Sequence, residues 1–514
     1  MLSIVYSAGL FGLDGFLVTV ECDASNSLDD FELVGLPDAA VKEAKERVRS
    51  AAGNSGFRFP DCSLTINLAP ADRRKEGSGF DVALLLGILH ASGALPAETD
   101  LRRRCFVGEL SLSGGVRGVR GILCMCLAAR DAGMTEFYAP AVNAEEAAAV
   151  SGIRVFAVHD MKELVAHLTG QALMTPVPSR STLDAAGHTG GPDFADVRGQ
   201  VMAKRAMEIA AAGGHNILLI GPPGTGKSML AKRLPSILPP LTFEEAVEAT
   251  KIHSVAGCLP EGVSLLSERT FRSPHHTMSA VSLVGGGIFP TPGEISLAHH
   301  GVLFLDELPE FPKQVTDALR QPLEDGQVTI TRANGRVTFP CSFMMVAAMN
   351  PCRCGYFGHP THKCTCSASS IHRYLSKISG PMLDRFDIQI ELPSLTYEEI
   401  SGQSAPAESS AEVRERVVAA RARATERMRE EKSIYCNAQM DAGQIHRYCI
   451  LDGDARELLH AAYETLGLSA RGYDRLLRVA RTIADLDDSD TIGAAHVAEA
   501  VQLRSLDKKY WGND

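Results

Sequence analysis

A phosphate-binding loop between a short apolar strand (216–220, NILLI) and a helix (MLAKRL) limits what this chain can be. The loop consists of Gly221, Pro222, Pro223, Gly224, Thr225, Gly226, Lys227 and Ser228. The G-x-x-x-x-G-K-S pattern in this setting is typical of P-loops, whose backbone N–H groups surround phosphate oxygens. We therefore predict an ATP site in which Lys227 reaches the β- and γ-phosphates and Ser228 binds Mg²⁺. The alternative, an accidental glycine-rich turn, is disfavoured by the flanking strand and helix.

Two further apolar runs end in polar side chains. Residues 301–305 (GVLFL) lead into Asp306 and Glu307, and residues 344–349 lead into Asn350. Ligands bind at the carboxyl ends of parallel strands, so we expect these side chains near the phosphates. Asp306 is predicted to hold the Mg²⁺ ion, Glu307 to polarise the attacking water and Asn350 to position that water. The alternative for Asn350 is a residue that only starts a turn before the next proline.

Composition excludes several classes of protein. The chain has 514 residues with 62 acidic and 51 basic side chains, giving a net charge of −11. A globally basic nucleic-acid binder is therefore excluded, although a local basic patch is not. The 13 cysteines are mostly scattered singly, which predicts reduced thiols and a cytoplasmic protein. The apolar N-terminus lacks a basic segment, so we expect no signal peptide, and no apolar run is long enough to span a membrane.

Local patterns predict an α/β multidomain protein. Residues 1–170 mix strand-like and helix-like segments and are expected to form one α/β domain. Residues 171–193 are rich in Pro, Ser, Thr and Gly, which is typical of a linker. Residues 194–392 form the second expected α/β domain and contain the phosphate loop. Residues 393–514 show mainly helical patterns.

A short loop after Asn350 holds a group of cysteines. They are Cys352, Cys354, Cys364 and Cys366. Two close thiolate pairs separated by a Gly- and Pro-containing segment can surround a tetrahedral Zn²⁺, so we interpret the loop as a structural zinc site. The alternative is a reduced, cysteine-rich loop whose shape needs no metal. A catalytic zinc is disfavoured, because four cysteines would fill its coordination shell.

Several motifs together carry a family resemblance. They are the phosphate loop, GVLFLDELPEF (301–311), MNPCRCG (349–355), KISGPMLDRFD (377–387), FELVGLPDAAVKEAKERVRSA (31–51) and SARGYDRLLRVARTIADL (469–486). The combination resembles the AAA+ ATPases of the YifB/ComM group, the magnesium-chelatase-like proteins, over essentially the whole chain. The resemblance implies an AAA+ P-loop core, a helical C-terminal lid and a hexameric ring. It further implies a DNA branch-migration motor in natural transformation, which would act on single-stranded or branched DNA.

The resemblance also assigns roles to two arginines. Arg385 matches the arginine finger that completes a neighbour's site, and Arg471 matches the sensor-2 arginine of the lid. The alternative for each is a surface salt bridge. Two segments, 272–293 and 327–339, are predicted pore hairpins, the second because it alternates polar and β-branched residues around Asn-Gly. Arg332 and Arg336 flank that tip as candidate DNA-phosphate contacts, and the alternative is a rigid hairpin packed at a subunit interface.

The N-terminal region resembles the Lon-protease fold (ribosomal S5 domain 2-like), but its peptidase chemistry does not transfer. That chemistry needs a serine nucleophile activated by a lysine. Gly79 stands where the nucleophile would be and Leu123 where the lysine would be. We interpret Ser78, one position away, as a helix N-cap. We therefore predict no peptidase activity and expect an interaction or DNA-binding platform.

Three functions compete. The leading one is an ATP-driven DNA translocase or branch-migration motor. The second is a motor subunit of a magnesium chelatase, which the fused N-terminal region and cysteine-rich loop disfavour and which would depend on porphyrin and partner proteins. The third is a protein remodeller or scaffold, which would show ATP turnover independent of DNA.

Overall fold

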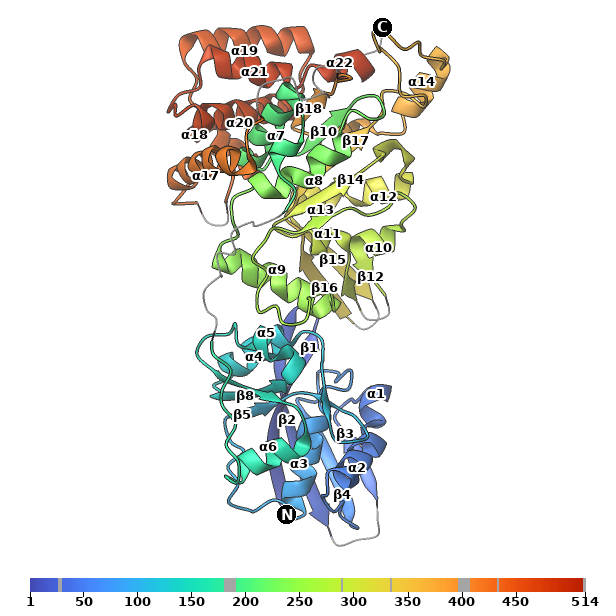
Figure 1. The fold of residues 1–514 in the computed structure, drawn as a ribbon, viewed down its shortest axis with the longest axis vertical. Coiled ribbons are helices and arrows are strands. Elements are labelled where there is room, and N and C mark those ends of the chain that lie inside the picture. Colours follow the sequence, from blue (N-terminus) through green and yellow to red (C-terminus); the bar gives the residue numbers. More distant parts are fainter. Residues whose placement is uncertain are drawn as a thin grey trace.

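The computed structural model describes residues 1–25, 30–179, 191–287, 290–332, 335–395, 407–431 and 434–511. The molecule is elongated, and its parts follow one another along the long axis (Figure 1). An N-terminal α/β body lies at one end, a second α/β body lies in the middle, and the C-terminal helices lie at the other end (Figure 1). Residues 180–190 of the expected linker lie outside the described residues.

The N-terminal body is built on a mixed sheet with the order β3-β4-β2-β1-β5-β8-β9. Its strands are β1 (Leu2–Phe11), β2 (Asp14–Ser25), β3 (Phe31–Val34), β4 (Ser63–Ala69), β5 (Arg104–Phe106), β8 (Glu136–Pro140) and β9 (Arg154–Val158). A small ladder pairs β6 (Glu109–Leu110) with β7 (Val116–Arg117). The antiparallel strands β1 and β2 alternate buried and more exposed residues along much of their length, as expected of strands with one face on a core.

Helices cover this sheet. They are α1 (Ala39–Lys42), α2 (Ala44–Asn54), α3 (Asp81–Ala91), α4 (Ile122–Asp131), α5 (Ala144–Ala147) and α6 (Met161–Leu168). Helix α3 is apolar nearly all round, and ten of its eleven residues are buried. A helix of this kind belongs inside a core, here against β1 and β2.

The N-cap predicted at Ser78 is wrong. Helix α3 begins at Asp81 and its N-cap is Phe80, which makes no side-chain capping bond. The Ser78 hydroxyl instead donates a hydrogen bond to the carboxylate of Glu109. The Asp81 carboxylate is held by Arg47 and by the backbone N–H of Leu110, so its contacts tie the start of α3 to the β6–β7 side of the body.

The middle body is built on a parallel sheet with the order β11-β14-β17-β10-β18. Its strands are β10 (Ile217–Ile220), β11 (Phe271–Arg272), β14 (Val302–Leu305), β17 (Met344–Met349) and β18 (Ile388–Glu391). The strands β10, β14 and β17 are buried throughout, which explains their unbroken apolar sequences. The two runs that end in polar side chains, β14 and β17, are neighbours in the sheet.

Helices and two small ladders complete this body. The helices are α7 (Val201–Gly213), α8 (Lys227–Ile237), α9 (Phe243–Ala256), α10 (Ala280–Val284), α11 (Glu294–Leu297), α12 (Lys313–Ala318), α13 (Arg320–Asp325), α14 (Ala368–Leu375) and α15 (Gly380–Leu383). The ladders are β12 (Gly285–Gly286) with β13 (Thr291–Pro292), and β15 (Gln327–Arg332) with β16 (Gly335–Pro340). The β15–β16 pair confirms the hairpin predicted at 327–339, with Arg332 opposite Gly335.

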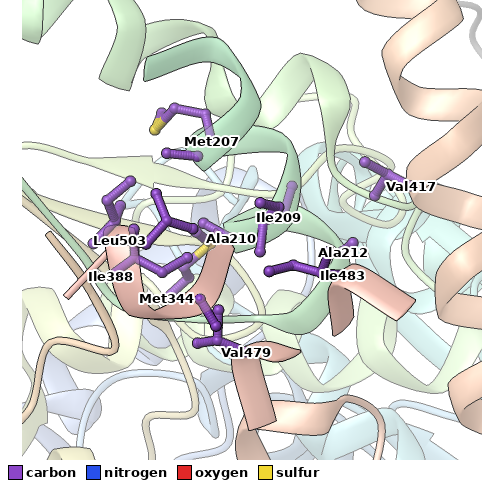
Figure 2. Packing of buried hydrophobic residues seen from close by; sticks show 14 of the residues in the cluster. Met207, Ile209, Ala210, Ala212, Met344, Ile388, Val417, Val479, Ile483 and Leu503 are labelled. Carbon is purple, nitrogen blue, oxygen red and sulfur yellow. The ribbon is translucent and has the colours of Figure 1, made fainter. Parts of the chain in front are cut away.

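The C-terminal helices share a core with the middle body. They are α17 (Ser410–Arg427), α18 (Ala442–Tyr448), α19 (Gly453–Leu466), α20 (Ala470–Leu486), α21 (Ala494–Gln502) and α22 (Leu506–Trp511). Figure 2 shows Val479 and Ile483 of α20 and Val417 of α17 gathered around Ile209 and Ala212 of α7. Because apolar burial stabilises by roughly 25 cal/mol per Å², this shared core fixes the helices on the side of α7. In the described part of the chain, no helix is both long enough and apolar enough to cross a membrane.

The N-terminal body contacts the middle body through α9 and the β15–β16 hairpin. The hydroxyl of Ser254 in α9 donates a hydrogen bond to Glu146, and the backbone N–H of Gly121 donates to the Ser254 carbonyl. At the hairpin, a Cβ placed on Gly12 would lie 2.5 Å from Val337, so backbone and side chain approach closely there. The hairpin predicted to line a pore therefore also packs on the N-terminal region of its own chain.

Candidate nucleotide-binding site

The phosphate loop connects the buried strand β10 to helix α8. Gly224 and Gly226 have φ of 81° and 90°, values that side-chain-bearing residues rarely adopt. Helix α8 begins at Lys227, so its N-terminal N–H groups and the positive end of its dipole face the loop. The sequence pattern therefore has the local geometry that P-loop phosphate binding requires.

Lys227 is buried inside this loop. Its ammonium donates hydrogen bonds to the carbonyls of Gly221 at 2.7 Å and Pro222 at 2.9 Å, and to Oδ1 of Asn350 at 3.2 Å. Burial lowers the pKa of Lys227 to about 8, and the charge of Asp306 opposes that shift. The structure thus brings Asn350, from the tip of β17, to the lysine of the loop.

The donor set for a magnesium ion is also assembled. The Ser228 hydroxyl donates a hydrogen bond of 2.7 Å to Oδ2 of Asp306, which follows β14. A hydroxyl and a carboxylate oxygen this close suit a hard cation such as Mg²⁺, which prefers oxygen ligands. The second oxygen of Asp306 accepts a 3.0 Å hydrogen bond from the backbone N–H of Glu307. The residues present therefore fit the ion that accompanies ATP.

Glu307 follows in a left-handed conformation with φ of 54°. Its side chain is 58% exposed, and its Oε2 lies 3.6 Å from Nδ1 of His276. A φ in this region is strained for a residue with a side chain, and the Glu307 carboxylate is largely open to solvent. His276 is a site neighbour that sequence reasoning missed; the His275–His276 pair in the 272–293 segment is the only sequence signal for it.

Gln200 was also missed. It caps α7 with φ of 54°, is buried, and donates from Nε2 to the carbonyls of Thr225 at 3.3 Å and Pro393 at 2.8 Å. It therefore joins the phosphate loop to the segment after β18. A lone glutamine before a helix carries no sequence signal for this role.

Arg385 lies at the amino ends of the parallel strands, whereas the phosphate loop lies at their carboxyl ends. It precedes β18, and its carbonyl accepts a 3.0 Å hydrogen bond from Asn216, which precedes the parallel strand β10. Both strands run from Arg385 toward the loop, a length of about 13 Å for four residues. Arg385 is 8% exposed, and its Nη2 donates a hydrogen bond to Glu324 at 2.5 Å. Its Nε and Nη1 are buried without a hydrogen-bond partner among the described residues.

Arg471 lies at the same end of the sheet as Arg385. It occupies the first turn of α20 and is exposed, and it lines a cleft of about 800 Å³ together with Arg385, Arg475 and Glu324. The structure thus brings the two predicted arginines to one cleft and separates both from the phosphate loop of their own chain.

The predicted cysteines converge. The sulfur of Cys352 lies 3.3 Å from that of Cys354 and 3.7 Å from that of Cys364, and the last two are 3.6 Å apart. The sulfur of Cys366 completes a group whose members all lie within 4.8 Å of one another. Zn–S bonds of about 2.3 Å in a tetrahedron place sulfurs about 3.8 Å apart, so the four thiols fit a zinc ion.

The two predicted DNA-contacting arginines are exposed on the β15–β16 hairpin. Arg332 ends β15 and Arg336 pairs with Thr331 across the ladder. Residues 333–334, which include Asn334 of the predicted tip, lie outside the described residues. In the second predicted hairpin, Arg272 is tied to Glu294 by two hydrogen bonds of 2.7 Å.

The fold and site together define a P-loop nucleotide-binding protein of the AAA+ type. Three family models match successive parts of the chain: "Magnesium chelatase, subunit ChlI" at residues 193–400, "Subunit ChlI of Mg-chelatase" at 20–143, and "Magnesium chelatase, subunit ChlI C-terminal" at 407–504. The chain belongs to the magnesium-chelatase-like family that includes YifB and ComM.

Its similarity to these relatives extends over nearly the whole chain. It is 44% identical over 509 residues to the uncharacterized protein YifB of Escherichia coli strain K12, covering 99% of this chain and 98% of the relative. It is 45% identical over 510 residues to the competence protein ComM of Haemophilus influenzae, covering 98% of each. An uncharacterized protein of Mycobacterium tuberculosis strain H37Rv is 41% identical over 500 residues, covering 97% of this chain and 98% of the relative.

Proposed function

We propose that this protein is a ring-forming ATPase that uses ATP hydrolysis between subunits to move DNA strands. One observation carries the proposal: Arg385 and Arg471 lie at the amino ends of the strands, and the phosphate loop of the same chain lies at their carboxyl ends. Two arginines that share a cleft but cannot reach their own nucleotide are suited to a neighbour's γ-phosphate. Head-to-tail contacts of this kind close into a ring, and a hexamer is the ring we propose.

The chemistry follows from the residues at the loop. The loop amides and Lys227 would bind the phosphates, and Ser228 and Asp306 would hold Mg²⁺, which would neutralise the charge that develops on the phosphates. Glu307 would accept the proton of the attacking water, and Asn350 would orient that water. The arginines of the adjacent subunit would complete the charge stabilisation, which in related transfers contributes orders of magnitude in rate.

DNA is the proposed substrate of the motion. The name of one relative, a competence protein, supports a role in natural transformation, and the domain order of the whole chain is shared with it. Because the net charge is −11, DNA contact must rely on local groups such as Arg332 and Arg336 on the hairpin. We place cytoplasmic branched or single-stranded DNA in the channel of the ring.

The remaining regions have supporting roles in this proposal. The region 1–170 would be a Lon-protease-like platform without peptidase activity, since Gly79 and the buried Leu123 supply neither nucleophile nor base. The region 194–392 would be the AAA+ core and 393–514 its lid. The four cysteines of the loop would hold a structural zinc.

One second candidate has a specific observation in its favour. The matched family models are described as magnesium chelatase subunits, so a chelatase motor that works with partner proteins on a porphyrin is the alternative. Stimulation of ATP turnover by porphyrin and partner subunits, without stimulation by DNA, would support it. A protein remodeller would respond to neither.

The test is ATP turnover of the purified protein with and without single-stranded and branched DNA. The Lys227→Ala variant is the blank, because it removes the ammonium that contacts the phosphates. We expect DNA to stimulate wild-type turnover, the stimulation to decline with salt, and the variant to be inactive. Turnover in wild type that is indifferent to DNA would contradict the DNA motor and leave the ATPase in place.

A further inference from the structure

The cysteine-rich loop is attached to the nucleotide site at several points. Cys352 lies two residues after Asn350, whose side chain accepts a hydrogen bond from Lys227. Gly355 rests on the phosphate loop: its φ is 84°, and a Cβ on it would lie 2.5 Å from Cδ of Pro223. His359 contacts the hydroxyl of Ser394 at 2.7 Å, just beyond β18. The loop therefore bridges the tip of β17, the phosphate loop and the end of β18.

Contacts among side chains and turns, rather than regular secondary structure, shape this loop, for example the hydrogen bond from the backbone N–H of His362 to Nδ1 of His359. Residues 350–367 form no helix or strand. Backbone N–H groups of Gly355 and Phe357 point at the sulfur of the fully buried Cys352, and two others point at Cys354. The four cysteine sulfurs lie within 4.8 Å of one another, so a single metal ion could bind all four.

From this arrangement we infer that a zinc ion on Cys352, Cys354, Cys364 and Cys366 is a latch for ATP turnover. The ion would fix the loop, and the loop would hold Asn350 and Pro223 in the positions that hydrolysis needs. Zinc loss would release Asn350 and Pro223 together, because the cysteine-rich loop that contacts both contains no helix or strand. The inference rests on the proposed ATPase function and adds a metal-dependent control to it.

The fluorescence of a single tryptophan can report the state of the cysteine-rich loop independently of ATP turnover. The chain has one tryptophan, Trp511, and it packs in the same cluster as Cys364 and Cys366. The ring of its neighbour Tyr510 lies 6.3 Å from that of Phe357 in the loop. Movement of the loop therefore changes the surroundings of the only indole in the protein.

The experiment uses the full chain, expressed with zinc and then treated with a chelator. Bound zinc, Trp511 fluorescence, ATP turnover and the dissociation rate of a fluorescent ATP analogue are measured before and after, and again after Zn²⁺ is returned. We expect one zinc per chain, with its release changing the fluorescence. Turnover should fall by at least about tenfold, since small misplacements of positioning groups have effects of this size. The analogue should dissociate faster, and Zn²⁺ should reverse every change.

Two variants separate the latch from general damage. Cys366→Ser should lose zinc and turnover together, whereas Cys258→Ser, at an exposed cysteine outside the cluster, should keep both. A purified protein that binds no zinc, or one that loses zinc with unchanged turnover and analogue dissociation, would overturn the inference. If zinc-loaded protein hydrolyses no ATP, the proposed ATPase fails and the latch on turnover fails with it, whereas turnover that survives zinc removal unchanged contradicts the latch alone.

Discussion

The guanidinium of Arg385 is bound to the carboxylate of Glu324 at 2.5 Å, at the sheet edge that faces away from the phosphate loop. Glu324 lies in α13, which ends at the start of the β15–β16 hairpin. One arginine thus contacts the base of the proposed DNA hairpin and keeps two buried donors, Nε and Nη1, without partners among the described residues.

The first prediction concerns this ion pair. Glu324→Gln keeps the shape and removes the charge that faces the buried Arg385, so we expect the free energy of unfolding to fall by about 1–3 kcal/mol. Glu310→Gln is the matched control, because its pair with Lys377 is exposed on both sides and should contribute less than about 1 kcal/mol. Denaturant unfolding measures both, and equal losses would show that the Arg385 pair behaves as an ordinary surface pair.

The second prediction concerns Glu307. Glu307→Gln removes the proposed proton acceptor and leaves the loop untouched, so kcat should fall by about 100-fold or more. Binding of a fluorescent ATP analogue should stay within a few-fold of wild type. Steady-state kinetics measure kcat, and equilibrium titration measures binding of the analogue. A variant that retains wild-type kcat would remove Glu307 from the mechanism.

The third prediction concerns pH. Burial lowers the pKa of Lys227 to about 8, so in the free protein this group loses its proton as pH rises through that value. Phosphates favour the charged ammonium, and therefore raise its pKa when ATP binds. Below about pH 7 no proton is taken up at Lys227, and near pH 8 binding takes up a fraction of a proton, which weakens affinity at higher pH. Calorimetry in buffers of different ionisation enthalpy measures this uptake, which Lys227→Met should abolish.

The fourth prediction concerns the hairpin. Arg332→Ala and Arg336→Ala should each weaken DNA binding and make it less dependent on salt, with DNA-free ATP turnover unchanged. Arg102→Ala, an exposed arginine of the N-terminal body, is the control and should leave binding unchanged. Titrations with fluorescent single-stranded DNA at several salt concentrations test this. Unchanged salt dependence in both hairpin variants would place DNA elsewhere.

Much of the nucleotide site could be predicted from the sequence. The contact between Ser228 and Asp306 joins two motifs whose strands, β10 and β14, run parallel on either side of β17, so that their carboxyl ends lie at the same end of the sheet. Asn350 was predicted at the same edge for the same reason, and it reaches Lys227.

Other features depend on packing that local patterns do not carry. Arg385 could be assigned a role by resemblance, but its place on the far edge and its partner Glu324 emerge only from the fold. Gln200 and His276 approach the site from outside the recognised motifs, and only the His275–His276 pair gives any sequence signal. The predicted cap at Ser78 was wrong because Asp81, tied to Arg47, begins the helix three residues later.

The most direct test of the account is subunit mixing with Lys227→Ala and Arg385→Ala. Each variant alone should be nearly inactive, because every interface lacks either the phosphate-binding lysine or the finger. In an equal mixture, about one quarter of head-to-tail interfaces pair an intact loop with an intact Arg385. ATP turnover of the mixture should therefore recover to about a quarter of wild type if interfaces act independently. A mixture that remains as inactive as its components, although mixed rings form, would contradict completion of the site by a neighbouring subunit.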